Sequence, residues 1–556
     1  TFDDVRKYGI GSTKWDGSLP LSTTGEKLEL GVLASSVVTD YDTNALTLWL
    51  EEVTGLDLVF TIFAGSGSDM ATQLSLMFTG GEETPDIIHS ANISNAVKGE
   101  YVKEGYLTNI AGYYITDSYY YSKALETCIG DDPARYVTFM NGIENYSADM
   151  ETGMCFGPAY IADNETDAVY NETHINTEWL KKLNLKAPTT IDELYDVLVA
   201  FKNGDPNGNG KKDEIPLMGL VHTKGRGVDN YIFNAFIQYA PSRYAMVENG
   251  KTFSPWITDE YREALKFTNK LVKERLLNTM AFVGAESNLL ALLNPEKGKP
   301  LTVGIVCAFT AGDFLENSGS LFAYEELPAL KDAGFGRGGY SLFDAAVFQN
   351  RYAITSSCEN VQLAWRFMDF MCSPEANMRQ RWGEKGVDWN WIEETEFKDK
   401  AAGNGIYGDD AAFVVLQVDR MNVKWNNYMG CWTERSPQMF SDPDNPDYIN
   451  SYYKRSAQNV LMQKEIGQPE DQLLVFSRTP EEDARFGELY PDINYYFRMY
   501  RDEFCMGYMD PNDDAVWNEY VEKMKGLGLE EVLEIAQQSF DRQKAETEAY
   551  IASLEK

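Results

Sequence analysis

A polar loop with the sequence DPNGNGKKDEIP, residues 205–216, carries the residues whose spacing most clearly suggests chemistry. Asp205, Asn207 and Asn209 place side-chain oxygens at alternate positions, and Gly210 stands where a calcium-binding loop must turn sharply. The bidentate Glu expected at the twelfth position of such a loop is missing, because Pro216 stands there. The loop is therefore a calcium sensor, a degenerate loop or a metal site of another kind, and the elements around it must decide.

Residues that could serve nucleophilic or zinc-dependent catalysis are few and scattered. His89, His174 and His222 are the only histidines and form no HExxH motif, so a zinc hydrolase or a histidine-based triad is poorly supported. The seven cysteines show no CxxC spacing, and their odd number in a long chain predicts buried thiols. Among 86 acidic residues chance pairs are inevitable, and none stands out by its spacing. We predict no catalytic residues.

The elements that flank the polar loop are a helix and a strand. The segment TTIDELYDVLVAFKNG predicts a helix that begins with a capping box of Thr190 and Glu193. Its buried face consists of Ile191, Leu194, Val197, Leu198 and Phe201. The segment IPLMGLV after the loop predicts a strand. Since two helices flank the loop of an EF-hand, this order argues against an EF-hand sensor.

The region from Leu28 to Ser90 predicts strands that alternate with helices. Its strands are KLELGVLAS, LDLVFTIF with Leu56, Leu58, Phe60 and Ile62 on one face, and PDIIHS. The first helix is expected to begin at Asp42 or Thr43 and the second at Asp69. This order is typical of a doubly wound parallel α/β unit. Ligands of such sheets lie beyond the carboxyl ends of the strands, here around residues 35–42 and 89–95.

Length and charge limit the classes of protein further. A chain of 556 residues predicts two or more domains. The formal net charge of −37 makes nucleic acid and anionic membrane surfaces poor partners. No run approaches the roughly 20 apolar residues of a membrane helix. The opening segment TFDDVRKYG carries no signal peptide, as expected of a mature or trimmed chain.

Several segments together resemble one family, the extracellular solute-binding proteins (family 1) that carry oligosaccharides to ABC transporters. The segment NTEWLKKLNLKAPTTIDELYDVLVAFKNGDPNGNGKKDEIPL is similar to a block of that family almost throughout. The segments EEVTGLDLVFTIFAG, QLSLMFTGGEETPDII and EYVKEGYLTNI match its amino-lobe pattern in order. ENVQLAWRFMDFMCSPEANMRQRWGEKGVDW and VWNEYVEKMKGLGLEEVLEIAQQSFDRQ match later blocks, whereas residues 407–480 match none.

The resemblance implies an α/β fold of the periplasmic-binding-protein type, with two lobes and a ligand cleft between them. The amino-terminal lobe is expected to comprise residues 28–160 and 325–395, and the carboxyl-terminal lobe residues 161–324 and 396–556. The family is extracellular on the bacterial surface and held there by a lipid on a Cys upstream of the mature domain. The implied partners are an oligosaccharide and an ABC permease, and we expect a monomer.

The resemblance also favours calcium over an ordinary polar Asn-Gly turn at residues 205–214. The family's sites use this arrangement, with the last carboxylate drawn from Glu214. The expected ligands are Asp205, Asn207, Asn209, the carbonyl of Lys211, Asp213 and Glu214. Such an ion would be structural, because it ties the end of a helix to the following strand away from the ligand cleft.

Candidate ligand-binding residues are those that follow strand ends or lie in non-periodic aromatic segments. Sugars stack their apolar C–H faces on aromatic rings, while amides and carboxylates bind the hydroxyl groups. Trp425, Tyr428 and Trp432 lie in a polar segment where an exposed platform is as well supported as packing. The residues that follow strand ends are Tyr41, Asp42, Asn92, His222, Arg226 and Phe309.

The predicted function is capture of an oligosaccharide by lobe closure and its delivery to an ABC permease, without enzymatic activity. One alternative is a glycan-processing enzyme or surface glycan module. Another is a solute-binding protein for peptides or another polar nutrient, with the same fold and a different cleft. Turnover of a glycan would identify the enzyme, and a cleft lined by carboxylates without aromatic platforms would favour a cationic ligand.

Overall fold

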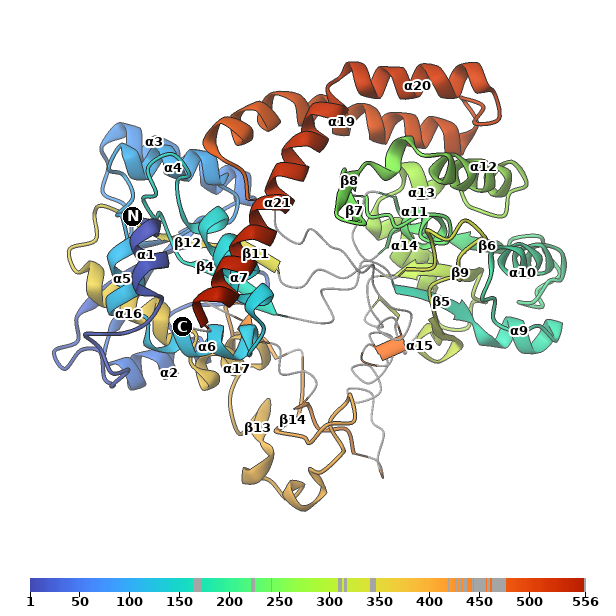
Figure 1. The fold of residues 1–556 in the computed structure, drawn as a ribbon. Coiled ribbons are helices and arrows are strands. Elements are labelled where there is room, and N and C mark those ends of the chain that lie inside the picture. The colour runs from blue at the N-terminus through green and yellow to red at the C-terminus, as the bar shows by residue number, and fades with distance from the viewer. Residues whose placement is uncertain are drawn as a thin grey trace. The chain divides into compact units, whose positions relative to one another are not determined.

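The structure of the protein is a computed structural model, and parts of the chain are described in it (Figure 1). The described residues are 1–163, 172–221, 226–241, 243–308, 313–314, 318–340, 347–418, 420–425, 429, 432–433, 438–442, 444, 457, 461–462 and 477–554. The chain divides into two compact units, which we call unit 1 and unit 2. Unit 1 comprises residues 1–164, 345–449 and 542–556, and unit 2 comprises residues 165–344 and 450–541.

Unit 1 is organised around a four-stranded sheet in the order β12-β3-β1-β2. Its strands are β1 (Lys27–Leu33), β2 (Asp57–Phe63), β3 (Ile87–His89) and β12 (Tyr352–Ile354). β1 pairs in parallel with both β2 and β3, whereas β12 is antiparallel to β3. The order strand, helix, strand, helix, strand from β1 to β3 confirms the parallel α/β unit that the sequence predicts.

Helices cover this sheet and carry the rest of unit 1. They are α1 (Phe2–Tyr8), α2 (Ala45–Thr54), α3 (Gly67–Gly80), α4 (Asn95–Lys103), α5 (Ala111–Thr116), α6 (Tyr119–Ile129), α7 (Pro133–Ser147), α16 (Val361–Phe370) and α17 (Pro374–Trp382). One cluster of buried residues joins Phe63 and Ile88 of the sheet to Met70, Leu74 and Phe78 of α3. A second small sheet contains β11 (Val347–Asn350), β4 (Ala159–Asp163) and β15 (Trp432–Thr433), and a third pairs β13 (Trp389–Trp391) with β14 (Phe413–Val415).

Unit 2 is built on a sheet in the order β10-β5-β9-β6, with β6 and β9 parallel. These strands are β5 (Glu172–Asn176), β6 (Ile215–Met218), β9 (Val303–Ala308) and β10 (Tyr324–Leu327), and a separate hairpin joins β7 (Met246–Glu248) to β8 (Lys251–Phe253). Alternate residues of β9 enter different cores: Ile305 and Cys307 one, Val306 and Ala308 the other. Apolar side chains therefore cover both faces of this sheet, as in a doubly wound fold.

The helices of unit 2 include the long carboxyl-terminal ones. They are α9 (Thr177–Leu183), α10 (Ile191–Asn203), α11 (Val228–Phe233), α12 (Asp259–Lys273), α13 (Met280–Val283), α14 (Glu286–Leu293), α15 (Ser320–Ala323), α19 (Pro480–Met506) and α20 (Asp514–Gly526). α21 (Leu529–Leu554) begins in unit 2, and its residues from 542 onward are grouped with unit 1. No helix among the described residues has the length and apolar character needed to cross a membrane.

The predicted helix starts are wrong by a few residues in unit 1. Asn44, rather than Asp42 or Thr43, caps α2, because its side chain accepts a hydrogen bond from the N–H of Leu46 at 3.0 Å. Ser66 caps α3, and Asp69 lies at the third helical position, where its carboxylate accepts the N–H of Ser66 in return. The side chain that reaches the free N–H groups of the first turn defines the cap.

The alternation expected along LDLVFTIF is also wrong at one position. Leu58 is buried, but Ile62 on the same expected face is 54% exposed. β2 is the edge strand of its sheet, so part of it lies beyond the helices that cover the centre. The six described cysteines, in contrast, are all buried thiols, as the sequence predicts.

The divisions of the chain differ from the expected lobes at residues 542–556, which fall in unit 1, and in two further segments. Residues 325–344 fall in unit 2, because β10 pairs with β5 along Glu325 to Leu327. Residues 396–449 fall in unit 1, because β14 pairs with β13 and β15 pairs with β4. Both assignments follow from strand pairs between segments far apart in the sequence. The first passage between the units, expected near MCFGPAYIADNETDAVY, falls at residues 164–165.

Candidate functional site

The carboxyl ends of β1 and β3 lie next to each other in unit 1, because the two strands are parallel neighbours. Tyr41, which follows β1, is buried, and its hydroxyl donates to the carbonyl of Leu33 at 3.1 Å. Its ring stacks on Phe60 at 4.8 Å between centroids, and burial raises the pKa of the phenol to about 12. Tyr41 therefore supports the strand end from inside. The neighbouring Asp42 is exposed and available to solvent.

Asn422, from the segment that also contains Trp425, forms hydrogen bonds with the loop that follows β1. The side-chain oxygen of Asn422 accepts the N–H groups of Thr39 and Asp40, both at 3.1 Å. The N–H of Asn422 donates to Val37 at 2.8 Å, and its carbonyl accepts the N–H of Ala45 at 3.0 Å. Asn422 has a positive φ of 60°, a conformation that Asn tolerates well. Asn422, within the segment 407–480 that matches no family pattern, thus helps to position the loop after the first strand.

Trp425 is part of the core of unit 1, which corrects the expectation of an exposed platform. Its side chain is 1% exposed, and its indole N–H donates to the hydroxyl of Thr47 at 2.9 Å. The ring meets Phe60 edge to face at 5.4 Å. The sequence gives no periodicity here because Trp425 packs from a loop, so its burial depends on contacts with α2 and β2 that are distant along the chain.

The end of β3 is connected to a buried polar cluster. Ser90 donates to the side-chain oxygen of Asn350 at 3.0 Å, and the ammonium group of Lys98 donates to the same oxygen at 2.8 Å. The amide of Asn350 donates to the carbonyl of Pro158, just before β4, at 3.0 Å. Asn350 therefore joins the ends of β3, α4 and two paired strands, β4 and β11. The predicted Asn92 lies beside this cluster in sequence and is exposed.

In unit 2 the predicted Arg226 follows β6 and is buried in an ion-pair cluster. Its guanidinium binds both oxygens of Asp313, at 3.1 and 2.8 Å, and reaches a carboxylate oxygen of Glu286 at 3.0 Å. A bidentate pair of this kind fixes the orientation of both side chains. Asp313 follows β9, the parallel neighbour of β6, so the cluster joins the carboxyl ends of both strands.

The side chains of the remaining candidates lie outside the described part of the structure. His222, Phe309 and Tyr428 lie outside the described residues. Trp432 is placed by its backbone in β15, where it pairs with Ala162 of β4. The two regions named in unit 1 do follow neighbouring parallel strands, and their role in ligand binding stays a prediction. The sequence does not reveal Asn422, Lys98 or Asn350. Their roles depend on contacts between segments 250 or more residues apart.

The polar loop at residues 205–214 connects α10 to β6, as predicted. Asp205, Gly208 and Gly210 adopt positive φ angles of 45°, 72° and 73°. Asp205 accepts the N–H of Gly210 at 3.1 Å with one carboxylate oxygen. The amides of Asn207 and Asn209 donate to Asp213 at 2.9 and 3.0–3.1 Å, and these bonds hold the pKa of Asp213 below its ordinary value.

Two carboxylate oxygens of the loop are buried without hydrogen-bond partners: Oδ1 of Asp205 and Oε1 of Glu214. Burial raises the pKa of Glu214, and the negative charges of Asp213 and Asp205 raise it further. Unsatisfied carboxylate oxygens in a tight turn fit the hard oxygen ligands that Ca²⁺ prefers. However, no group of three or more His, Cys, Asp or Glu side chains in the described parts of the chain is arranged to hold a metal ion. Asp213 faces the two asparagine amides instead.

The chain forms two α/β units and passes between them four times, and polar side chains lie at the strand ends. These features together define a two-lobed solute-binding protein. The chain belongs to the bacterial extracellular solute-binding proteins, whose family model matches residues 36–378. This confirms the family that the sequence blocks indicate.

Individual relatives match nearly the whole chain. The fructooligosaccharide ABC transporter substrate-binding protein FusA of Streptococcus pneumoniae serotype 4 is 25% identical over 521 residues, 92% of this chain and 90% of FusA. The solved HMO-binding, ABC-transporter-associated solute-binding protein of Bifidobacterium longum infantis is 17% identical, with a TM-score of 0.69 over 93% of this chain and 99% of its own. The EF-hand mutant of FusA in complex with fructo-nystose is 20% identical, with a TM-score of 0.69 over 94% of this chain and 100% of its own. The two structures confirm the two-lobed fold.

Proposed function

We propose that the protein is the substrate-binding component of an ABC transporter, which captures an oligosaccharide and delivers it to a membrane permease without chemical turnover. The observation that carries the proposal is the match to FusA, which extends over 92% of this chain and includes both units. FusA is a fructooligosaccharide-binding protein of that transporter class. Family membership supports a location outside the cytoplasm, at the cell surface or in the periplasm.

The proposed ligand contacts are side chains at the strand ends and in the aromatic segment after residue 420. Asp42 and Asn92 would bind hydroxyl groups from unit 1, and Arg226 would orient Glu286 and Asp313 in unit 2. Trp432, Tyr428, Phe309 and His222 are proposed as further contacts. Tyr41 and Trp425 are proposed to act indirectly, because they hold the loop after β1 in place without contact with the ligand.

The experiment that tests this function is isothermal calorimetry of the purified protein against a set of neutral oligosaccharides, which includes kestose, nystose, maltotetraose and xylotetraose. We expect one of them to bind with one-to-one stoichiometry and to be recovered unchanged after prolonged incubation. Release of shorter sugars would contradict the non-enzymatic proposal. Binding of a charged peptide in preference to every sugar would contradict the ligand class.

We further propose that Ca²⁺ binds the loop at residues 205–214 and stabilises unit 2. The support comes from the two buried carboxylate oxygens without partners and from the positive φ angles that turn the loop on itself. The ligands would be Asp205, Asn207, Asn209, the carbonyl of Lys211, Asp213 and Glu214. Binding would require Asn207 and Asn209 to turn their amide oxygens toward the ion and to release Asp213.

The calcium proposal is tested by the change in melting temperature between calcium-loaded and chelator-treated protein. A ligand that binds only the folded state adds RT ln(1 + [L]/Kd), about 2.7 kcal/mol at a hundredfold excess over Kd. Asp205→Ala should remove most of this response, whereas Asp196→Ala, an exposed acid on α10, should keep it. An identical melting curve with and without chelator, together with no metal in elemental analysis, would refute the site.

The proposed partners and attachment are a permease in the membrane, a lipid on a Cys upstream of residue 1, and a monomeric state. Nucleic acid is not proposed as a partner, because the net charge of −37 repels phosphate. Light scattering of the purified protein tests the monomer. Metabolic labelling of the native full-length protein with a clickable fatty acid tests the anchor.

A further inference from the structure

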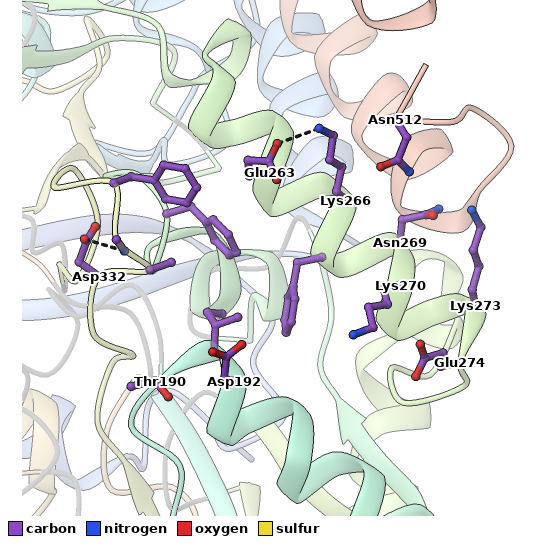
Figure 2. Close-up of a pocket in the computed structure, with 16 residues that line it drawn as sticks. Thr190, Asp192, Glu263, Lys266, Asn269, Lys270, Lys273, Glu274, Asp332 and Asn512 are labelled. Carbon is purple, nitrogen blue, oxygen red and sulfur yellow. Dashed lines mark hydrogen bonds and ion pairs between the residues drawn. The ribbon is translucent and has the colours of Figure 1, made fainter. Parts of the chain in front are cut away.

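Unit 2 contains a pocket that none of the predicted ligand residues lines (Figure 2). Its volume is about 910 Å³, and every residue around it belongs to unit 2. One wall is the exposed face of α12, which presents Glu263, Lys266 and Lys270. The opposite wall consists of the first turn of α10 and residues 332–335. The volume lies within the range of about 300–1,000 Å³ typical of small-ligand sites.

Three phenylalanines give the pocket an aromatic lining. Phe236 is buried, and its ring centroid lies 6.1 Å from Phe267 of α12 and 5.8 Å from Phe335. Phe335 is the outermost of the three, with 43% of its surface exposed. An exposed ring backed by a second ring is a flat apolar surface that remains in contact with water. Such a surface is suited to stacking against the C–H face of a ring-shaped ligand.

The loop that carries Phe335 is held in place by hydrogen bonds to Asp332. The carboxylate of Asp332 accepts the N–H groups of Gly334, Gly336 and Gly338, each at 2.9 Å. Burial alone would raise the pKa of Asp332, but these N–H groups lower it below its ordinary value. A side chain at Gly338 would collide with the carbonyl of Ala235, at 2.2 Å from its Cβ. The glycines therefore allow a close-packed loop that presents Phe335 in advance of binding.

The rim of the pocket carries hydrogen-bonding groups of both signs. Three ammonium groups (Lys266, Lys270 and Lys273) stand among four carboxylates (Asp192, Glu263, Glu274 and Asp332), of which Asp332 also accepts backbone N–H groups. Lys266 pairs with Glu263 at 2.7 Å, and the ammonium of Lys270 lies 3.6 Å from the centre of the Tyr195 ring. The amide of Asn512 adds a neutral group.

We propose that this pocket is a second saccharide-binding site, which takes a neutral sugar residue stacked on Phe335. A ligand with a strong net charge would meet at least three rim groups of its own sign, whereas sugar hydroxyl groups donate to carboxylates and accept from ammonium groups. A purely apolar ligand would leave those groups without partners. The site needs no closure of the units and no residue of unit 1, so it does not rest on the proposed transport function.

The test is lysine footprinting of the whole protein with an amine-acetylating reagent and mass spectrometry, in millimolar maltohexaose, cellohexaose or nystose. At least one sugar should reduce acetylation of Lys266 and Lys270 several-fold. Acetylation of Lys523, which lies over the Tyr496 ring elsewhere in unit 2, should not change. Phe335→Ala should abolish the protection, while Tyr508→Ala, which removes a 77% exposed ring outside the pocket, should preserve it.

The variants also separate this site from the proposed transport site. Calorimetric affinity for the transported sugar should be the same in the Phe335→Ala variant as in the wild type, because the residue lies outside the strand-end regions. Unchanged acetylation with all three sugars would overturn the proposal. It would also be overturned if protection persisted in the Phe335→Ala variant, or if only an added peptide gave protection.

Discussion

Lys98 is a basic side chain in the interior of unit 1, where it forms hydrogen bonds with Asn350. Its ammonium group donates to the backbone and side-chain oxygens of Asn350, at 3.1 and 2.8 Å, and lies 5.6 Å from the Phe156 ring centre. His89 and Arg351 lie in the same region, and neither supplies a negative charge. Burial lowers the pKa of Lys98 to about 7, and burial with the charges of Arg351 and Lys98 lowers that of His89 to about 4.

Replacement of Lys98 by Met should change how stability depends on pH. Between pH 7 and 10.5, the ordinary pKa of lysine, the unfolded chain binds a proton at Lys98 that the folded chain does not. Stability therefore rises with pH in this window, by up to about 1.4 kcal/mol per unit. Below pH 7 the ammonium group of Lys98 is charged in the folded protein, so its burial lowers the free energy of unfolding by the full amount. Urea unfolding of Lys98→Met should lose this rise, whereas Lys14→Met, at an exposed site, should retain it. Parallel pH profiles for wild type and Lys98→Met would refute this account.

Trp425 and Trp432 should respond differently to substitution. Because Trp425 is a core residue, Trp425→Ala should lower the free energy of unfolding by about 3–5 kcal/mol. Trp425→Phe should lower the free energy of unfolding by about 1 kcal/mol, because the hydrogen bond to Thr47 is lost. It should leave sugar affinity unchanged. Trp432→Ala, if this residue is a stacking platform, should weaken sugar binding by about 1–3 kcal/mol with little effect on stability. Chemical unfolding and calorimetry on the three variants distinguish the two roles, and a large affinity loss in Trp425→Phe would contradict them.

At the scale of elements, local sequence determines most helices and strands but not their first residues. The segment TTIDELYDVLVAFKNG forms α10 and buries Leu194, Val197, Leu198 and Phe201 as predicted. Thr190 is its cap, yet Glu193 does not complete the capping box, since its carboxylate accepts the N–H and hydroxyl of Thr189. Several polar residues compete near each helix start, and the choice depends on the path of the preceding loop, which the sequence pattern does not specify.

The capping box of α3 offers a direct measurement of such a start. Ser66 accepts the N–H of Asp69 at 3.3 Å, and Asp69 accepts the N–H of Ser66 at 2.7 Å. Ser66→Ala should therefore reduce stability by about 1 kcal/mol, as expected for loss of an N-cap. Ser68→Ala, two residues further on and also exposed, should change stability much less. Thermal unfolding gives both values, and equal losses in the two variants would show that the cap contributes nothing.

At the scale of the whole molecule, the sequence predicts two α/β units but not all of their boundaries. The first passage between the units follows from a change in local pattern near residue 160. The assignments of residues 325–344 and 396–449 depend on β10 with β5, β14 with β13 and β15 with β4. These short strands join distant segments, and nothing in their own residues identifies the partner. The same reason explains why Asn422 and Asn350 escape prediction as organisers of the strand ends.

The transport proposal predicts that a bound sugar makes the molecule more compact. A ligand that touches both units only when they close binds the closed state better, and this difference in affinity shifts the population. Small-angle scattering should show a smaller radius of gyration with the bound oligosaccharide than without it, and no change with a sugar that does not bind. Affinity should be nearly independent of salt, because a neutral ligand has no charge to screen, although the protein itself carries −37. An unchanged scattering profile at saturating ligand would contradict closure, and an affinity that collapses in high salt would point to a charged ligand instead.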